Sequence, residues 1–370
     1  MRSEFLLDPD VVYLNHGAFG ACPRPVFERY QAWQLELERQ PVEFIARRLA
    51  DLLDEARARL AAYVGADADA LVFVPNATSG VNLAARAIGL RRGDEVLTTD
   101  LEYGACDLAW ASVCERAGAR YVRARTELPL EREEDVVESL FAHVTEHTRA
   151  VFVSHITSET AAVLPLAAIV EHARRDGLVT IVDGAHAPGQ LDLDLRALGA
   201  DFYSGNCHKW MCAPKGAGFL CVSPEWQDAV DGLIVSWGHG EDASYTTRNE
   251  RQGTRDPSAY LAVPAAIDWM AAHDWPRVQE RCRALLVDAR ERLAQLDGVT
   301  PVAAPKFLAQ MASLRVPTGD PETLKRRLYD EHRIEIPVFA RKTEPMLRVS
   351  IGPYTVAREV DLLVGALAAQ

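Results

Sequence analysis

Two residues of complementary chemistry, Asp183 and Lys209, each follow a short apolar run that predicts a buried strand. Asp183 lies in Val182-Asp-Gly-Ala-His-Ala187, and Lys209 lies in Ser204-Gly-Asn-Cys-His-Lys-Trp210. An acid and a lysine side by side at strand ends are what pyridoxal phosphate chemistry requires. The lysine forms a Schiff base, and the carboxylate keeps the pyridine nitrogen protonated so that the ring accepts electrons. Most such residues are simply solvated, so the prediction depends on the neighbouring residues.

A candidate anion site lies in Phe73-Val-Pro-Asn-Ala-Thr-Ser-Gly80. A strand, a small polar turn and a helix N-terminus would turn free backbone N–H groups and the Thr78 and Ser79 hydroxyls toward a phosphate. An ordinary helix N-cap is the alternative, because serine and threonine are favoured there in any case.

Four further side chains could serve the same chemistry. His186 lies where a flat ligand would rest, and His208 could bind a phosphate or tune the amine of Lys209. Tyr103 could stack on an aromatic ring, or be a plain core or rim aromatic. Arg348, inside an apolar run, could hold a substrate carboxylate with two hydrogen bonds, or form an internal salt bridge.

The elements that must position these residues alternate in type. Apolar runs at 71–74, 95–98, 121–124, 150–153, 179–182 and 219–222 predict strands, and amphipathic stretches at 47–64, 78–90, 106–117, 166–176 and 192–198 predict helices. Alternating strands and helices indicate an α/β fold with a mostly parallel central sheet, and such sheets bind ligands at the carboxyl ends of their strands. Residues 225–260 have an irregular pattern. Helices at 257–273, 275–296, 321–332 and 356–369, with strands at 312–316 and 347–351, predict a smaller α+β domain.

Composition excludes several classes of protein. The chain has 370 residues, and its net charge of −13 argues against a nucleic-acid surface or an anionic membrane surface. The N-terminal apolar run is too short for a signal peptide, and no run is long enough to cross a membrane. Seven cysteines without paired spacing are typical of reduced thiols, so we expect a cytoplasmic protein. We assign no metal ligands.

Taken together, the motifs resemble the class V aminotransferase family of fold-type I pyridoxal phosphate enzymes, and within it the isopenicillin N epimerase-like branch. The resemblance covers nearly the whole chain. The matching runs are Leu14-Asn-His-Gly-Ala-Phe-Gly20, Asn76-Ala-Thr-Ser-Gly80, His155-Ile-Thr-Ser-Glu-Thr-Ala161, Asp183-Gly-Ala-His186, Gly205-Asn-Cys-His-Lys-Trp210, Ala213-Pro-Lys-Gly216 and Gln252-Gly-Thr-Arg-Asp256.

The resemblance implies a role for each matching residue. Lys209 would carry the cofactor as an aldimine and then move the Cα proton, Asp183 would pair with the ring nitrogen, and His186 would lie near the ring hydroxyl. Tyr103 would stack over the ring, and Arg348 would hold the substrate carboxylate. The remaining cofactor positions would be Thr78, Ser79, Ser158, Asn206 and His208, with Asn15 and His16 at the substrate.

The resemblance also implies the organisation of the protein. We expect an N-terminal arm at 1–20, a large cofactor-binding domain at 21–255 and a small domain at 256–370. Gly253 and Thr254 match a loop that reaches the phosphate of a neighbouring subunit, so we expect a homodimer with shared active sites.

The reaction is less narrowly defined. Cysteine desulfurases that relay a persulfide need a cysteine shortly before the carboxylate arginine, and residues 334–347 contain none. An epimerase acting on an amino-acid substrate is our first expectation, with Tyr103 or His16 as the second acid/base. A carbon–sulfur β-lyase acting on a cysteine conjugate and a class V aminotransferase remain alternatives. A non-catalytic, pyridoxal-phosphate-binding regulatory protein is disfavoured because Lys209, Asp183 and Arg348 are all in place.

Overall fold

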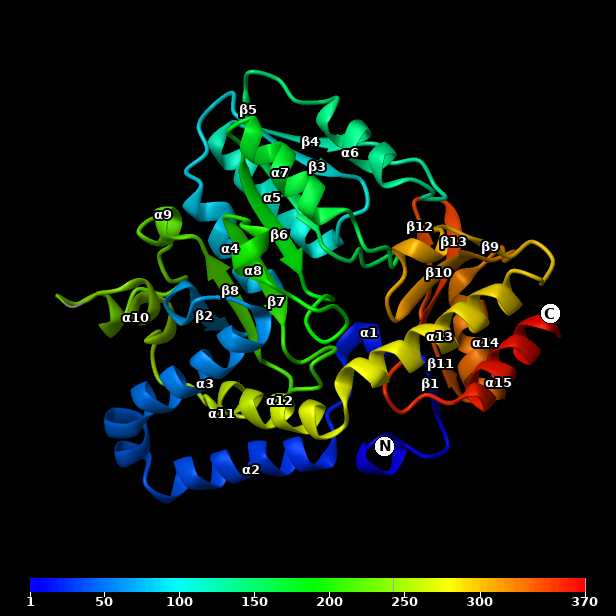
Figure 1. Cartoon of the computed structure of the whole chain (residues 1–370), viewed down its shortest axis with the longest axis horizontal. Coiled ribbons are helices and arrows are strands. Elements are labelled where there is room, and N and C mark those ends of the chain that lie inside the picture. The colour runs from blue at the N-terminus through cyan, green and yellow to red at the C-terminus, as the bar shows by residue number, and fades with distance from the viewer. Residues whose placement is uncertain (242, 370) are drawn as a thin grey trace.

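A seven-stranded sheet organises the larger part of the chain in the computed structural model, which describes residues 1–241 and 243–369 (Figure 1). Its strands, in spatial order, are β2 (Leu71–Val74), β8 (Gly218–Val222), β7 (Phe202–Asn206), β6 (Val179–Gly184), β5 (Thr148–Ser154), β3 (Glu95–Thr99) and β4 (Arg120–Ala124). All neighbouring pairs are parallel except those of β8, which runs antiparallel to both β2 and β7. The predicted α/β fold with a mostly parallel central sheet is therefore confirmed.

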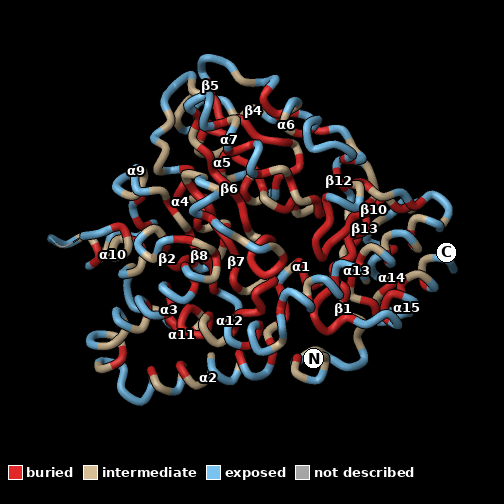
Figure 2. The backbone as a smooth tube through the Cα atoms, viewed as in Figure 1, coloured by how far each residue is buried: buried red, intermediate tan, exposed pale blue. Residues whose placement is uncertain are grey.

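Successive residues of each strand point to opposite faces of this sheet, and both faces are covered. On one face Phe152 and Ile181 pack with residues of the helices α4 (Ala77–Ala87) and α5 (Gly104–Ala117). On the other face their neighbours, such as Val151, belong to a larger core. Figure 2 shows the buried backbone concentrated along these strands. Burial on both faces explains why the central strands are mostly apolar, whereas the edge strand β4, which is partly exposed, contains two arginines.

Further helices surround the large sheet. They are α1 (His16–Phe19), α2 (Arg24–Arg39), α3 (Leu49–Val64), α6 (Glu133–Phe141), α7 (Leu166–Arg175), α8 (Leu195–Leu198), α9 (Pro224–Gln227), α10 (Tyr245–Glu250), α11 (Ser258–Leu261) and α12 (Val263–Ala272). Short 3-10 turns cover Arg2–Glu4, Ala68–Ala70, Trp237–His239 and Pro305–Phe307, and a π-helical turn covers Glu43–Arg48. Among the described helices, none combines the length and the apolar character that crossing a membrane requires.

A second, antiparallel sheet lies beside the first and is joined to it by the long helix α13 (Trp275–Leu293) (Figure 1). Its strands, in spatial order, are β12 (Val338–Arg341), β13 (Glu344–Ser350), β10 (Met311–Arg315) and β9 (Thr300–Pro301). Helices α14 (Pro321–His332) and α15 (Ala357–Ala368) complete this part. Strand β1 (Val12–Tyr13) pairs in parallel with β11 (Ile334–Glu335), so the N-terminal segment joins the C-terminal part of the chain.

Two predicted stretches differ in detail from the structure. The single helix expected at 257–273 is interrupted at Ala262, where α11 ends and α12 begins with Pro264 in its first turn. Proline has no N–H group and so favours the start of a new helix. The irregular stretch at 225–260 contains α10, whose N-cap Ser244 accepts a hydrogen bond from the Thr247 amide. The buried ion pair between Arg57 and Glu250 ties α10 to α3 at 2.8 Å.

Candidate active site

A cavity of about 330 Å³ opens at the carboxyl ends of strands β3, β5, β6 and β7 and at the N-terminus of α4. This is the edge at which parallel sheets of α/β proteins bind their ligands. The cavity is lined by Ala18, Phe19, Pro75, Asn76, Ala77, Thr78, Tyr103, Ser154, Ile156, Ser158, Asp183, Ala185, His186, Asn206, His208, Lys209 and Gly216. The predicted residues Thr78, Tyr103, Ser158, Asp183, His186, Asn206, His208 and Lys209 are among them.

Lys209 and Asp183 reach this cavity from neighbouring strands. Asp183 lies near the end of β6, and Lys209 lies just past the end of β7, which pairs with β6. The Asp183 carboxylate accepts hydrogen bonds from the Ala185 amide at 2.9 Å and from the Cys106 thiol at 3.4 Å. The Lys209 amine lies 3.2 Å from Nε2 of His186. The paired strand ends thus bring the predicted acid and amine into one site.

Burial controls the protonation of this pair. It lowers the pKa of Lys209 from 10.5 to about 8, and Arg348 acts in the same direction, while Asp183 opposes the shift. Burial also raises the pKa of Asp183, against the Ala185 N–H group and the positive charge of Lys209. A lysine whose pKa is lowered toward neutrality has a larger fraction of free amine, which is the nucleophilic form.

The phosphate end of the predicted site coincides with the N-terminus of α4. Asn76 caps this helix by accepting hydrogen bonds from the amide and the hydroxyl of Ser79, and Asn206 accepts from the Ala77 amide at 2.8 Å. Ser79 therefore serves the cap and does not line the cavity, whereas Thr78 does. The Thr78 amide has no acceptor among the described residues, and a helix N-terminus attracts anions through its dipole and its unpaired N–H groups.

His208 borders the same end of the cavity. Its Nδ1 donates to the Ala217 carbonyl at 2.8 Å, since a carbonyl oxygen can only accept. Burial lowers the pKa of His208 to about 4. Its Nε2 can therefore donate to a ligand only when the ring is protonated, and a phosphate dianion beside it would favour that form.

Arg348 on β13 reaches from the small sheet toward the cavity wall. Its Nη1 donates to the Ser158 carbonyl at 2.6 Å and to the Ser158 hydroxyl at 3.3 Å, and its buried Nε has no partner in the described part of the chain. Burial lowers the pKa of Arg348 to about 10, against the opposing effect of Glu159. Within residues 1–241 and 243–369, no carboxylate pairs with this guanidinium.

Asn15 and His16 do not line the cavity. His16 is buried behind Lys209, with Nε2 3.1 Å from the Lys209 carbonyl and Nδ1 3.1 Å from the Tyr354 hydroxyl. The Asn15 amide donates to Glu335 at 2.9 Å. The arm that carries both residues passes so close to the lysine loop that a Cβ at Gly20, whose φ is +70°, would lie 2.2 Å from the His208 carbonyl. Glycine is therefore required there.

The loop residues Gly253 and Thr254 are also absent from the cavity lining. Both are exposed, and a Cβ on Gly253 would meet nothing within 4 Å. One chain alone does not bring this loop to its own site.

Sequence reasoning did not single out a buried hydrogen-bonded group beside the cavity, formed by Glu102, Thr99 and Ser154. The Glu102 carboxyl lies 2.6 Å from the Thr99 hydroxyl and 2.6 Å from the hydroxyl of Ser154, which lines the cavity. Burial raises the pKa of Glu102 to about 8. The position of Glu102 directly before Tyr103 could have indicated a place near the site, but a glutamate in a turn is ordinarily solvated.

The unpaired polar groups of the site match pyridoxal phosphate. Among the described residues, the Thr78 amide at the N-terminus of α4 has no acceptor and could bind the phosphate, and the buried Asp183 carboxylate has no cation and could pair with the ring nitrogen. The Lys209 amine could react with the aldehyde carbon. The orphaned Nε of buried Arg348 adds a place for a substrate carboxylate. Thr78, Asp183 and Lys209 would hold the cofactor.

Comparisons with known proteins agree with this geometry. The family model for class V aminotransferases matches residues 12–363. The chain is 40% identical to the isopenicillin N epimerase of Amycolatopsis lactamdurans and 38% identical to that of Streptomyces clavuligerus, with 99% of this chain and 96% of each relative covered. Among solved structures, a C-DES variant with glycine covalently linked to its pyridoxal phosphate cofactor superposes with a TM-score of 0.87. It is 24% identical and covers 100% of this chain and 99% of its own. The chain belongs to the class V aminotransferase family.

Proposed function

We propose that this chain is a pyridoxal-phosphate-dependent epimerase that inverts the Cα of an amino-acid substrate. The support is its full-length similarity to two isopenicillin N epimerases and a cavity that holds the groups such a reaction requires. The substrate class that we propose is an α-amino acid with a free amine and a free carboxylate, of which isopenicillin N is the first candidate.

One observation carries the choice of epimerisation. Two side chains that can exchange protons line the cavity, and they follow strands that lie on opposite sides of β6, the strand of Asp183. In the sheet order β7-β6-β5-β3, Lys209 follows β7, Asp183 lies near the end of β6, and Tyr103 follows β3 at the start of α5. Tyr103 is 44% exposed, and its hydroxyl has no hydrogen-bond partner among the described residues. Inversion at carbon requires proton removal on one face and proton delivery on the other.

Each residue has a defined task in this proposal. When bound, the cofactor supplies an electron sink for the negative charge at Cα. Lys209 holds the cofactor, and its free amine takes the Cα proton on one face, while the Tyr103 hydroxyl gives a proton on the other. Asp183 stabilises positive charge at the ring nitrogen. Arg348, fixed by Ser158, orients the substrate through its carboxylate.

The fold around Arg348 disfavours a persulfide relay. Strands β12 and β13 are joined by a tight hairpin in which Arg341 pairs with Glu344, so only Lys342 and Thr343 form the turn. Arg341 and Lys342 both contact Asp100 of the large sheet's loops, at 3.5 and 2.6 Å. Neither a cysteine nor a mobile loop that could carry one is present in this hairpin.

A homodimer with shared active sites is the assembly that we propose. The segment 233–237 exposes a run of apolar side chains, with Val235 79% and Trp237 92% exposed. It belongs to the same stretch of chain as Gly253 and Thr254, which the resemblance assigns to a neighbouring subunit's phosphate. An exposed apolar patch of this kind is a common mark of an interface between proteins.

The free state of all seven cysteines supports a cytoplasmic location.

The experiment that tests the function is proton NMR of the cofactor-loaded protein in D2O with isopenicillin N, a panel of L-amino acids and cysteine S-conjugates. An epimerase replaces the Cα proton by deuterium, leaves the substrate otherwise intact and produces its epimer on chiral analysis. A substrate that is converted to pyruvate, ammonia and a thiol would show a lyase. A substrate that yields its keto acid would show an aminotransferase.

A further inference from the structure

Both ring nitrogens of the cavity residue His186 have partners. The indole Nε1 of Trp210 donates to Nδ1 at 3.3 Å, and the amine of Lys209 lies 3.2 Å from Nε2. Trp210 immediately follows Lys209 in the chain, so one short loop contacts the same histidine from both sides.

The donor and acceptor capacities of these groups determine where the protons lie. An indole N–H can only donate, so Nδ1 of His186 must be an acceptor and carry no proton. The single proton of the neutral ring is then on Nε2, and Nε2 is a donor. A protonated lysine has three donors and no acceptor, so an ammonium at Lys209 would face another donor. A neutral amine has a lone pair and can accept this bond.

We infer that Trp210 is a positioning residue that acts through His186: its indole N–H fixes the His186 proton on Nε2 and thereby favours the neutral amine of Lys209. Burial of His186, which moves its pKa well below the usual value, is consistent with a neutral ring. The free amine is the form that attacks an aldehyde and that accepts a proton, so the importance of this device for catalysis rests on the proposed function.

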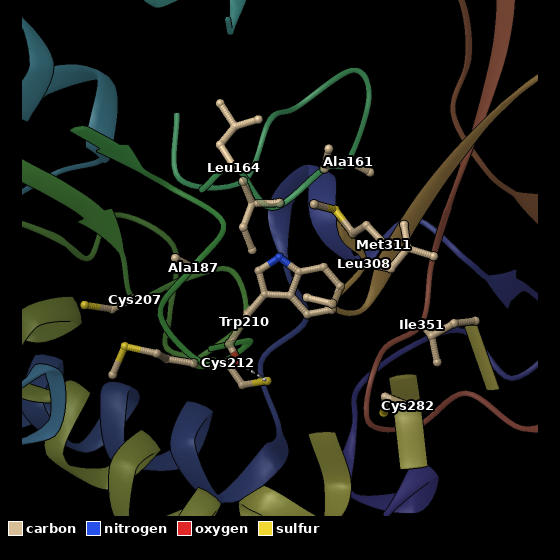
Figure 3. Packing of buried hydrophobic residues seen from close by; sticks show 14 of the residues in the cluster. Ala161, Leu164, Ala187, Cys207, Trp210, Cys212, Cys282, Leu308, Met311 and Ile351 are labelled. Carbon is tan, nitrogen blue, oxygen red and sulfur yellow. Dashed lines mark hydrogen bonds between the residues drawn. The ribbon is translucent and has the colours of Figure 1, made fainter. Parts of the chain in front are cut away.

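The packing around Trp210 keeps its indole N–H group pointing toward His186. The side chain is fully buried, and Figure 3 shows it between Leu164 and Ala161 of the loop after β5 and Met311 of β10. A Cβ at Gly189 would lie 2.3 Å from the Trp210 carbonyl carbon, so the backbone is also confined. The indole therefore cannot rotate toward another acceptor without displacing the side chains that surround it.

A second histidine fixes the backbone of Lys209 in the same way. The Lys209 carbonyl can only accept, so Nε2 of His16 donates to it, and Nδ1 of His16 then accepts from the Tyr354 hydroxyl. The His16 and Trp210 rings lie 4.7 Å apart. Burial lowers the pKa of His16 to about 3, which agrees with a neutral ring.

Other charged and titratable groups also act on this site. Asp183 favours the ammonium form of Lys209, whereas Arg348 disfavours it. The positive charges of Lys209 and Arg348, together with His16, lower the pKa of the buried His186. The effect of Trp210 must therefore be measured as a difference between variants in which these groups are unchanged.

The test uses the full-length chain freed of cofactor, with Trp210→Phe as the first variant. In the wild type, ¹⁵N NMR of labelled histidines should show His186 as the Nε2–H tautomer. In Trp210→Phe, Nδ1 is free to carry the proton, so Nε2 can accept from a Lys209 ammonium. The pH midpoint for capture of added pyridoxal phosphate should then rise by about one unit, since the amine loses an advantage of roughly tenfold.

Two further variants separate this role from simple packing. Trp33→Phe is the matched control, because Trp33 is also buried and donates its N–H at 2.9 Å, but to the Leu261 carbonyl far from the site. It should leave both readings unchanged. In a His186→Gln background the tautomer no longer exists, so adding Trp210→Phe should produce no further shift in the midpoint.

An unchanged His186 tautomer and an unchanged midpoint in Trp210→Phe would overturn the inference, whatever reaction the enzyme catalyses. If Trp210→Phe does not fold, 3-benzothienylalanine at position 210 replaces the N–H group by sulfur with almost the same shape, and the same two outcomes apply. If the midpoint shifts but no amino acid exchanges its Cα proton, the proposed function fails while the inference stands.

Discussion

Two residues at the site have no partner of opposite charge among the described residues: Asp183 is a buried carboxylate without a cation, and Arg348, beside the cavity wall, is a buried guanidinium without a carboxylate. Lys209 is an amine held beside a neutral histidine. Buried charges in proteins are ordinarily paired, because an unpaired charge in a poorly solvated place is costly. Each of these residues therefore indicates a complementary group on a ligand.

Lys209→Ala should abolish covalent attachment of pyridoxal phosphate, since alanine has no amine to form the imine. The yellow absorbance near about 420 nm, expected from imine chemistry, should be lost, and borohydride should no longer fix a mass adduct on the chain. Lys215→Ala is the control, because Lys215 lies nearby but donates to the Gly20 carbonyl. A persistent adduct in Lys209→Ala would place the attachment elsewhere.

Arg348→Ala should weaken substrate binding through the loss of a charged hydrogen bond, by about 1.5–3 kcal/mol, or roughly a ten- to hundredfold rise in KM. Arg315→Ala is a suitable comparison, because Arg315 lies on the neighbouring strand β10 and pairs with Glu344 at 2.9 Å. Its KM should remain at the wild-type value. Equal saturation curves for Arg348→Ala and the wild type would mean that the carboxylate is held by another residue.

Tyr103→Phe should separate the two proton transfers. Lys209 can still remove and return the Cα proton on its own face, so deuterium should enter the L-substrate in D2O. Formation of the opposite isomer should fall by about 10²–10⁴-fold, the usual contribution of a positioned acid. NMR and chiral chromatography of the same sample measure both rates. Parallel loss of both would give Tyr103 a role in holding the cofactor rather than in proton delivery.

At the scale of single elements, the turn between β3 and α5 contains a feature that the sequence did not predict, a buried carboxyl group. Glu102 in this turn is buried, and no cation pairs with it within the described ranges. Its pKa is raised from 4.5 to about 8 by burial, against the hydrogen bonds from Ser154 and Thr99. At neutral pH the carboxyl is therefore largely protonated and can donate to one of these two hydroxyls.

Glu102 makes stability depend on pH in a defined direction. Because the folded-state pKa is raised, its contribution is fully present below about pH 4.5 and is lost as the pH rises through about 8. Between pH 6 and pH 9 the wild type should lose on the order of 2 kcal/mol of unfolding free energy that Glu102→Gln retains. Urea unfolding at both values measures this, and Glu115→Gln, an exposed change on α5, should follow the wild type. Parallel curves for all three proteins would contradict the assignment.

The elements show how far sequence alone reaches. The strands predicted at 71–74, 95–98 and 179–182 are present, because residues buried on both faces of a sheet are mostly apolar and such a run can be recognised from the local sequence. The break at Ala262 and the helix α10 were missed. α10 depends on the distant ion pair of Glu250 with Arg57, and such tertiary contacts override local preference.

The same limit applies to the site. Residues of the cavity that lie at strand ends, such as Asp183 and Lys209, were predictable because parallel strands bring their carboxyl ends together. The positions of His16 and Glu102 were not, since each depends on partners from other elements, Tyr354 and Ser154. A pattern in sequence identifies a residue type but not the atoms that will surround it.

At the scale of the whole molecule, the proposed dimer can be tested by complementation. Lys209→Ala and Thr254→Arg should each be inactive, the first without an amine and the second with a bulky cation at the phosphate of the neighbouring subunit. Co-expressed, they should form heterodimers with one intact site and recover up to about a quarter to a half of wild-type activity, as expected for closed two-fold symmetry. Sedimentation should confirm the heterodimer. Confirmed heterodimers without activity would mean that each chain builds its site alone.

The pairing of β1 with β11 has a consequence for the order in which the protein is made. Val12 lies beside Ile334, so β1 has no strand partner until synthesis has reached β11, many seconds later at about 5–20 residues per second. The arm also carries Gly20 and His16, which pack against the backbone of the lysine loop. A nascent or truncated chain that ends before β11 can fold its large sheet but cannot secure this loop. Cofactor capture should thus mark chains whose synthesis has passed β11.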